Sequence, residues 1–261
     1  MASLEGVQSR VTDSGCIMAA MAFTRPRHWL RWLLVAVAGL VVLAAAGPFV
    51  YIHFFNSTPA ALSLSPGSTP ASTATANTAT SNTTGSGSVA GAWTVGSGSV
   101  VGYRVNEVLL GQNATAVGRT TSVTGHLSIA GSTVTGGAFS VPMATVHSDK
   151  SQRDAQFDGR IMDVSQYPTA TFTLTSPIDL APLPAGGVIK DYTAHGRLTL
   201  HGTTRAVTFT LSAERKGSQI EVSGDIAVLF SDYGISNPSF AGFVTTQDHG
   251  LLEFLLVFDR G

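Results

Sequence analysis

Residues 192–211, YTAHGRLTLHGTTRAVTFTL, decide the fold of this chain. Apolar side chains recur at every second position on both sides of the polar stretch 201–203, whose middle residue is Gly202. Alternation with a period of two predicts two half-buried strands, and a short turn containing glycine predicts that they pair as an antiparallel hairpin. The apolar phase of the hairpin consists of Tyr192, Leu198, Leu200, Val207, Phe209 and Leu211.

The same alternation continues in both directions from this hairpin, over residues 93–261. It predicts about eight strands rich in Val, Thr, Ile and Phe and joined by short Gly, Pro or Ser turns, and such neighbours pair antiparallel. A sheet of this size with one apolar face packs on a second sheet or closes on itself. We therefore expect an all-β domain, an extended antiparallel eight-stranded barrel. The other predicted strands lie at Val101–Val105, Val123–Ile129, Phe139–Met143, Phe172–Leu174, Ile220–Val228 and Leu251–Phe258.

One interval, residues 148–166, interrupts the strands and favours a short helix. Ser148 or Asp149 is a suitable cap at its start, the helix would run through Phe157, and Gly159 would end it. Arg153 and Asp154 lie near the expected helix start, where a paired acid and base would dock the helix on the sheet.

Residues 33–55 form an apolar segment of the length of a transmembrane helix. Arg25, Arg27 and Arg31 precede it, so the positive-inside rule predicts a cytoplasmic tail over 1–32 and an extracytoplasmic C-terminal domain in a single-pass protein of the cell membrane. A cleaved signal peptide is the alternative, because Ala44-Ala45-Ala46-Gly47 contains an A-x-A pattern. Pro48 and the apolar residues after it favour the retained helix.

Residues 56–92 consist almost entirely of Ser, Thr, Ala, Pro, Gly and Asn, with Leu62, Leu64 and Val89 as the exceptions. Such a composition cannot bury enough apolar surface to offset the entropy of ordering, so we expect a disordered linker. It separates the predicted membrane helix from the folded domain, residues 93–261.

Charge and cysteine content exclude several functions. Only 12% of the chain is charged, its formal net charge is −1, and no cationic cluster offers a footprint for nucleic acid. Cys16 is the one cysteine, so neither an intrachain disulfide nor a cysteine-based metal site is possible.

Several short motifs over residues 93–261 resemble the YceI-like polyisoprenoid-binding family. The resemblance implies an extended, lipocalin-like barrel in a secreted or periplasmic setting, here in a membrane-anchored form, whose apolar lumen holds a long-chain isoprenoid lipid. It implies no catalytic residue, no metal and no cofactor besides the lipid ligand. The motifs are Trp93-Thr94-Val95 with Ser99-Val100-Val101-Gly102-Tyr103, Ser151-Gln152-Arg153-Asp154 before Phe157, Tyr167-Pro168-Thr169-Ala170-Thr171-Phe172, Gly196–Arg205 followed by Val207, and Asp232-Tyr233-Gly234-Ile235.

A site for such a lipid needs an apolar tunnel and a few polar groups at its mouth for the head group, which would be a phosphate or a quinone. We expect His147, Arg153 or Arg205 to meet the head group, because each is cationic or titratable and lies near a turn. A lumen filled by its own side chains is the alternative. The expected lining residues are Tyr103, Val105, Phe139, Phe157, Phe172, Leu174, Leu198 and Leu200.

Two other functions remain open at this point. His147, Asp149, Asp154 and Asp158 lie close in sequence and invite a metal-dependent hydrolase, but their spacing is unsuitable and no second histidine is near. The second function that remains open is that of an interaction or structural protein of the cell envelope. The last strand has a second apolar face, which would form a homodimer seam or be covered by residues 237–249. That face carries Leu251, Leu255 and Val257.

Overall fold

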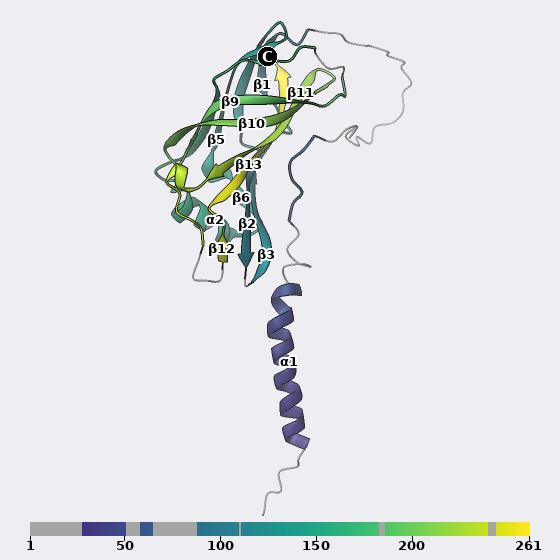
Figure 1. Ribbon diagram of the computed structural model, residues 1–261, viewed down its shortest axis with the longest axis vertical. Coiled ribbons are helices and arrows are strands. Elements are labelled where there is room, and N and C mark those ends of the chain that lie inside the picture. The colour runs from purple at the N-terminus through teal and green to yellow at the C-terminus, as the bar shows by residue number, and fades with distance from the viewer. Residues whose placement is uncertain (1–27, 51–57, 65–87, 110, 183–185, 240–243) are drawn as a thin grey trace, which may run out of the picture. The chain divides into compact units, whose positions relative to one another are not determined.

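The structure is a computed structural model that describes residues 28–50, 58–64, 88–109, 111–182, 186–239 and 244–261 (Figure 1). The chain divides into two compact units, Met1–Gly47 and Pro48–Gly261. All the strands in these described ranges belong to the second unit.

Helix α1 spans His28–Val50, and its described side chains, among them Trp32 and Leu40, are exposed. Residues 51–55 of the predicted membrane span lie outside the described residues. Within the part of the chain that the structure describes, no helix combines the length and the hydropathy needed to cross a membrane. The predicted span over 33–55 and the topology derived from it stay predictions from the sequence.

The strands of the second unit form one antiparallel sheet, whose order is β1-β4-β5-β7-β9-β10-β11-β13-β2-β3-β6. Two short strands lie off this path, since β12 pairs with β2 and β8 with β5. The bounds are β1 Gly91–Val95, β2 Val100–Leu109, β3 Gln112–Thr120, β4 Thr124–Ala130, β5 Thr133–Pro142, β6 His147–Ser148, β7 Thr169–Leu174, β8 Ile178–Asp179, β9 Lys190–Leu200, β10 Thr203–Lys216, β11 Gln219–Leu229, β12 Val244–Thr246 and β13 His249–Arg260.

Strand β13 closes this sheet into a barrel. Along one edge it pairs with β11; along the other it pairs first with β2, where Leu252 lies opposite Tyr103, and then with β1, where Phe258 lies opposite Val95. Strands β1 and β2 together form one bent wall strand, and β3 and β4 form its neighbour. The ring of β1/β2, β3/β4, β5, β7, β9, β10, β11 and β13 is the predicted eight-stranded antiparallel barrel.

Strand β3 is the part of the wall that the alternation did not reveal. Its sequence, QNATAVGRT, has short side chains on both faces and therefore little contrast between them. Gly118 explains one of these short positions, because a Cβ there would lie 2.3 Å from the ring of Tyr103 on β2. The choice of residue at Gly118 therefore reflects the space that the Tyr103 ring occupies, and not an apolar pattern within β3.

The helical interval differs from its prediction at both ends. Helix α2 spans Ser151–Gln156 after Lys150, which donates no side-chain cap, and the π-helical turn η3 continues it over Phe157–Ile161. The predicted stop at Gly159 is wrong, because its carbonyl oxygen accepts a hydrogen bond from the Asp163 amide at 3.0 Å within the continuing turn. The one-turn 3-10 helices η2, Met143–Thr145, and η4, Ser231–Tyr233, complete the elements.

Three of the sequence motifs meet on the barrel at the β9–β10 turn. Both residues of that turn have positive φ, 49° at His201 and 72° at Gly202, as a two-residue type I′ hairpin requires. The His201 ring lies 4.5 Å from the ring of Tyr167, and a Cβ on Gly202 would lie 2.5 Å from that tyrosine. Nδ1 of His201 also lies 3.1 Å from the carbonyl oxygen of Tyr233. The residues of these motifs hold the β9–β10 turn against neighbouring segments of the barrel.

The predicted linker is not uniform, since residues 58–64 lie against the barrel wall in an arrangement that we call the strap (Figure 1). Arg104 of β2 donates to the carbonyl oxygen of Pro59 at 2.8 Å, and Arg119 of β3 donates to that of Ala60. Both guanidinium groups also bind Glu253 of β13, whose side chain is only 4% exposed. The composition of the linker does not predict this contact, because the linker contributes backbone carbonyl groups to it and not side chains.

A second contact fixes the end of the strap, and a third fixes the end of the linker. The Leu64 amide donates to Oγ of Ser223 on β11 at 3.3 Å. Val89 is buried at 5% exposure, and its carbonyl oxygen accepts from the Trp93 indole at 2.8 Å. The barrel thus includes Val89, ahead of the predicted boundary at 93.

The outer face of β13 is partly covered by the barrel's own chain. Val257 is 7% exposed, and its amide donates to Oγ of Ser99 at 2.9 Å from the turn between β1 and β2. Leu251 and Leu255 are half-buried. A homodimer through this face stays a prediction.

Candidate functional site

The lumen of the barrel contains a cavity of about 730 Å³. Two clusters of buried apolar side chains surround it, one that includes Phe258 and Ile129, the other including Leu198 and Phe157. The volume falls within the range of roughly 300–1,000 Å³ that is usual for sites that enclose a small ligand. The alternative of a lumen filled by its own side chains does not agree with a cavity of this size.

The eight side chains predicted to line the lumen all line this cavity. Strand alternation places them there, because β2, β5, β7 and β9 each direct one face inward. Phe157 reaches the cavity from the start of η3. These residues are Tyr103 and Val105 of β2, Phe139 of β5, Phe172 and Leu174 of β7, Leu198 and Leu200 of β9, and Phe157. Their contact with a lipid stays a prediction.

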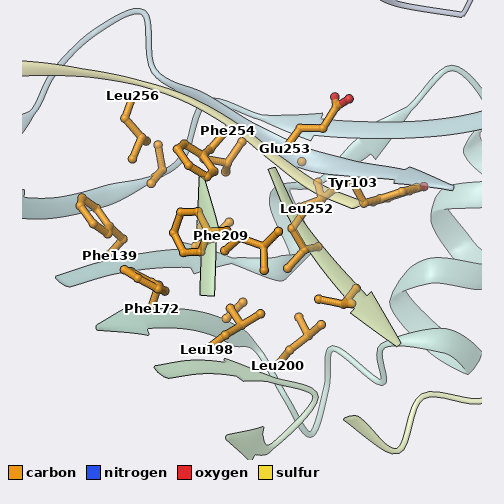
Figure 2. A pocket seen from close by; sticks show the side chains of 18 of the residues that line it. Tyr103, Phe139, Phe172, Leu198, Leu200, Phe209, Leu252, Glu253, Phe254 and Leu256 are labelled. Atoms are coloured by element: carbon orange, nitrogen blue, oxygen red, sulfur yellow. The ribbon is translucent and has the colours of Figure 1, made fainter. Parts of the chain in front are cut away.

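Five phenylalanine side chains form a belt around the lumen: Phe139, Phe172, Phe209 and Phe254 are labelled in Figure 2, and the fifth is Phe258, a member of one of the two clusters. Phe172 lies 6.2 Å from Phe139 and 5.5 Å from Phe209, ring centroid to ring centroid. Phe254 lies 5.8 Å from Phe209, and Phe258 lies 5.8 Å from Phe139. The belt therefore connects β5, β7, β10 and β13 through edge and stacked contacts.

The prediction missed the members of the belt on β10 and β13, together with other lining residues of the same wall. Phe209 shares the apolar phase of its strand, which was the available signal. Strand β13 is apolar on both faces, so its pattern did not identify the inward side. The structure does, since Phe254 and Leu256 face the other labelled rings in Figure 2 while Glu253 points away from them.

Glycines on neighbouring strands explain why these rings leave the lumen open. A Cβ on Gly125 would lie 2.4 Å from the ring of Phe139, and one on Gly224 would lie 2.7 Å from the ring of Phe254. Each of these glycines is directly opposite its aromatic residue in the sheet. The rings therefore lie flat along the barrel wall, over backbone that carries no side chain, instead of crossing the cavity.

A cluster of polar side chains lines the cavity where α2 and η3 meet β2. Nη2 of Arg153 lies 3.3 Å from Oε1 of Glu107, and Nη1 of Arg153 donates to Asp149. Tyr103 stacks on Phe157 at 5.1 Å, and burial raises the pKa of Tyr103 to about 12. The side chains that contribute polar atoms to this end of the lining are those of Glu107, Gln152, Arg153, Gln156 and Arg160.

Of the three predicted head-group residues, the structure brings only Arg153 to the cavity. The side chain of His147 is 65% exposed and lies 3.5 Å from Oδ2 of Asp154 on the outside of the barrel. Nε of Arg205 donates to the carbonyl oxygen of Asp232 at 3.0 Å, also outside. Arg153 and Asp154 dock the helix through separate partners, since Asp154 accepts from Ser148 at 2.6 Å.

The acidic residues near His147 do not assemble as ligands for a metal. Across the described ranges, no group of three His, Cys, Asp or Glu side chains has the geometry to hold an ion. Oδ1 of Asp154 accepts from the Ser148 amide and hydroxyl, and Asp149 binds Arg153. These carboxylates serve as acceptors that fix the start of α2.

The chain is similar to known proteins in two respects, since a family model matches its sequence and solved structures share its fold. The model of a family described as the YceI-like domain matches residues 93–258. A solved structure of a polyisoprenoid-binding domain from Saccharophagus degradans, implicated in plant cell wall breakdown, is 16% identical, with a TM-score of 0.53 over 65% of this chain and 98% of that chain. This likeness supports the barrel fold.

Two further solved structures are similar at lower scores. Burkholderia cenocepacia BcnA is 19% identical, with a TM-score of 0.49 over 61% of this chain and 95% of that chain. A Campylobacter jejuni YceI protein is 14% identical, with a TM-score of 0.46 over 55% and 85% of the respective chains. No curated protein matches the chain.

Proposed function

The chain belongs to the YceI-like family, whose model matches more than half of it, and from this premise we propose that the barrel binds a long-chain isoprenoid lipid in its lumen. The observation that carries the proposal is the apolar cavity of about 730 Å³, bounded by the phenylalanine belt and two apolar clusters. Burying an apolar chain there gains roughly 25 cal/mol per Å² of surface removed from water.

The protein acts in this proposal by holding its ligand and not by catalysis. The lining is mainly apolar, and Arg153, a charged residue in it, is already paired with Glu107 and Asp149. Such a site suits carriage, storage or sensing of a lipid at the cell envelope. The relative from Saccharophagus degradans, described as a polyisoprenoid-binding domain, is consistent with this class of ligand.

The proposal includes the membrane anchor predicted from the sequence. Residues 33–55 would hold the chain in the cell membrane, with the barrel outside the cytoplasm and close to a source of lipid. Extraction of native membranes at alkaline pH tests the anchor, because an integral protein stays in the membrane pellet. Protease treatment of intact cells tests the side on which the barrel lies.

Two adjacent residues of β13 provide a matched test of lipid binding. Leu252 lines the cavity, whereas Leu251 lies on the outer face of the same strand, and both are half-buried. The full chain is purified in detergent and incubated with the polyprenol solanesol, and co-eluting lipid is measured by mass spectrometry. L252W fills the lumen and should lose most of the bound solanesol, while L251W should retain it. Equal retention by both variants would refute binding in the lumen.

A further inference from the structure

The charges at the polar end of the cavity are already balanced by one another. The Arg153 side chain, 19% exposed, lies between Glu107, which is 9% exposed, and Asp149. Its guanidinium group donates to both carboxylates. Two N–H groups of the guanidinium are therefore already bound to carboxylates, and a ligand phosphate that approached this cation would lie close to both negative charges.

Charged residues of both signs surround this end of the barrel. Of the acids, Glu107 lines the cavity, while Asp149, Asp154 and Asp158 do not; Oδ1 of Asp158 is buried and has no hydrogen-bond partner among the described residues. The cations are Arg153 in the lining, Lys150 outside it and Arg160 in the lining.

Those last two cations are engaged as well. Nζ of Lys150 lies 3.7 Å from Oδ2 of Asp149. The exposed Arg160 donates to Oε1 of Gln156 at 3.0 Å and to the carbonyl oxygen of Pro238 at 3.3 Å. Away from this end the charged lining residues are Glu214, Arg215 and Glu253, and Glu253 is paired with Arg104 and Arg119.

Neutral hydrogen-bonding groups are present at the same place. The amide side chains of Gln152 and Gln156 line the cavity and offer both donors and acceptors. Tyr103 lines the cavity as well, and its hydroxyl group is protonated and able to donate at neutral pH, since even its ordinary pKa of 10.0 lies far above neutrality. A ligand hydroxyl or quinone carbonyl needs only such groups, whereas a phosphate would bring its charge beside Glu107 and Asp149, which already hold Arg153.

We infer that the head group accepted at this site is uncharged, a hydroxyl or quinone carbonyl, and that Glu107 is the residue that excludes a phosphate by holding Arg153. The inference rests on the proposed lipid-binding function and narrows its ligand from phosphate or quinone to the uncharged class. Glu107 is a specificity residue, because its carboxylate occupies the cation that a phosphate would use.

Two probes with the same isoprenoid chain test this inference, solanesol and solanesyl phosphate. The full-length wild-type chain in detergent should bind solanesol at least about tenfold more tightly than solanesyl phosphate. E107Q removes the more buried of the two carboxylates that hold Arg153, so the affinity for the phosphate should rise about tenfold while that for solanesol stays the same. D149N removes the second, more exposed partner and should act in the same direction if E107Q folds poorly.

Glu221 provides the control, since it pairs with Lys216 at 3.1 Å on the outside of the barrel. E221Q removes the same charge without touching the cavity and should leave both affinities unchanged. If wild type binds the phosphate as tightly as the alcohol, or if E107Q and D149N leave the preference unaltered, the inference is wrong while lipid binding stands. If neither probe binds, the proposed function itself fails.

Discussion

The imidazole Nδ1 of His201 lies 3.1 Å from the backbone carbonyl oxygen of Tyr233, and this contact ties the β9–β10 turn to the 3-10 turn after β11. A carbonyl oxygen can only accept, so Nδ1 carries the proton. The same ring packs 4.5 Å from Tyr167, ahead of β7. One side chain thus joins three segments that are distant in the sequence.

The first prediction concerns this histidine. Substituting His201 with Asn keeps a residue that tolerates its positive φ of 49° but removes the ring. The lost hydrogen bond and ring contact should lower the free energy of unfolding by about 1–2 kcal/mol. Chemical denaturation measures the change. H195N serves as the control, because His195 is an exposed residue of β9; an equal loss there would contradict the assigned role.

The second prediction concerns the glycines under the aromatic rings. In G118A the new methyl group would lie 2.3 Å from the Tyr103 ring, which must move into the lumen and away from Phe157. The variant should lose about 1–3 kcal/mol of stability, as overpacked cores do, and should bind less solanesol. Thermal unfolding and lipid quantification measure the two effects.

Gly136 of β5 offers the matched control, because a Cβ there meets nothing within 4 Å. G136A should keep the wild-type stability and lipid content. If G118A bound lipid as well as G136A does, the glycine beneath the Tyr103 ring would not be what keeps that ring out of the lumen.

The third prediction follows from the pKa of Tyr103, raised by burial from 10.0 to about 12. As the pH rises above 10, the unfolded chain loses this phenol proton before the folded chain does. The stabilisation is therefore complete below about pH 10 and is lost as the pH approaches 12, by about 2–3 kcal/mol. The difference in unfolding free energy between wild type and Y103F should shrink over that window. A difference independent of pH would contradict it.

The fourth prediction concerns the cluster beneath the strap. Replacing Arg104 with Ala leaves the 4% exposed Glu253 with one partner fewer, and R104A/R119A leaves it with neither. Because an unpaired buried charge is costly, the double variant should lose about 3–5 kcal/mol of stability and release the strap to proteases. Adding E253Q should restore part of the stability but not the strap. R197A, at an exposed position of β9, is the control.

Much of the barrel was predictable because most of its strands have one face exposed to solvent and one apolar face that points into the lumen. The hairpin 192–211 and the inward phases of β2, β5, β7 and β9 follow from that contrast. Strand β3 lacks contrast because its residues are short, and β13 lacks it because Val257 on its outer face is covered by the turn at Ser99. Alternation carries no information where both faces have the same environment.

The polar part of the site was less predictable, since the sequence does not show whether the side chain of a cationic residue near a turn points into the barrel or outward. In the sequence, Arg153, Arg205 and His147 are equivalent candidates for the head-group contact, and only their contacts in the structure distinguish them. Glu107 was missed because it lies beyond the predicted strand Val101–Val105; a charged residue in the inward, apolar phase of β2 was the available signal. The strap escaped prediction because backbone carbonyl groups are common to every residue type.

The pairing of β13 has a consequence for the order of events during synthesis. Before residues 249–260 leave the ribosome, β11 has a free edge on one side and β1 and β2 have theirs on the other. Unpaired edges and an open apolar face invite aggregation, so the nascent chain is vulnerable until the step in which β13 pairs with both edges. The cavity comes into existence with that step, and a chain truncated before His249 has no lumen to fill.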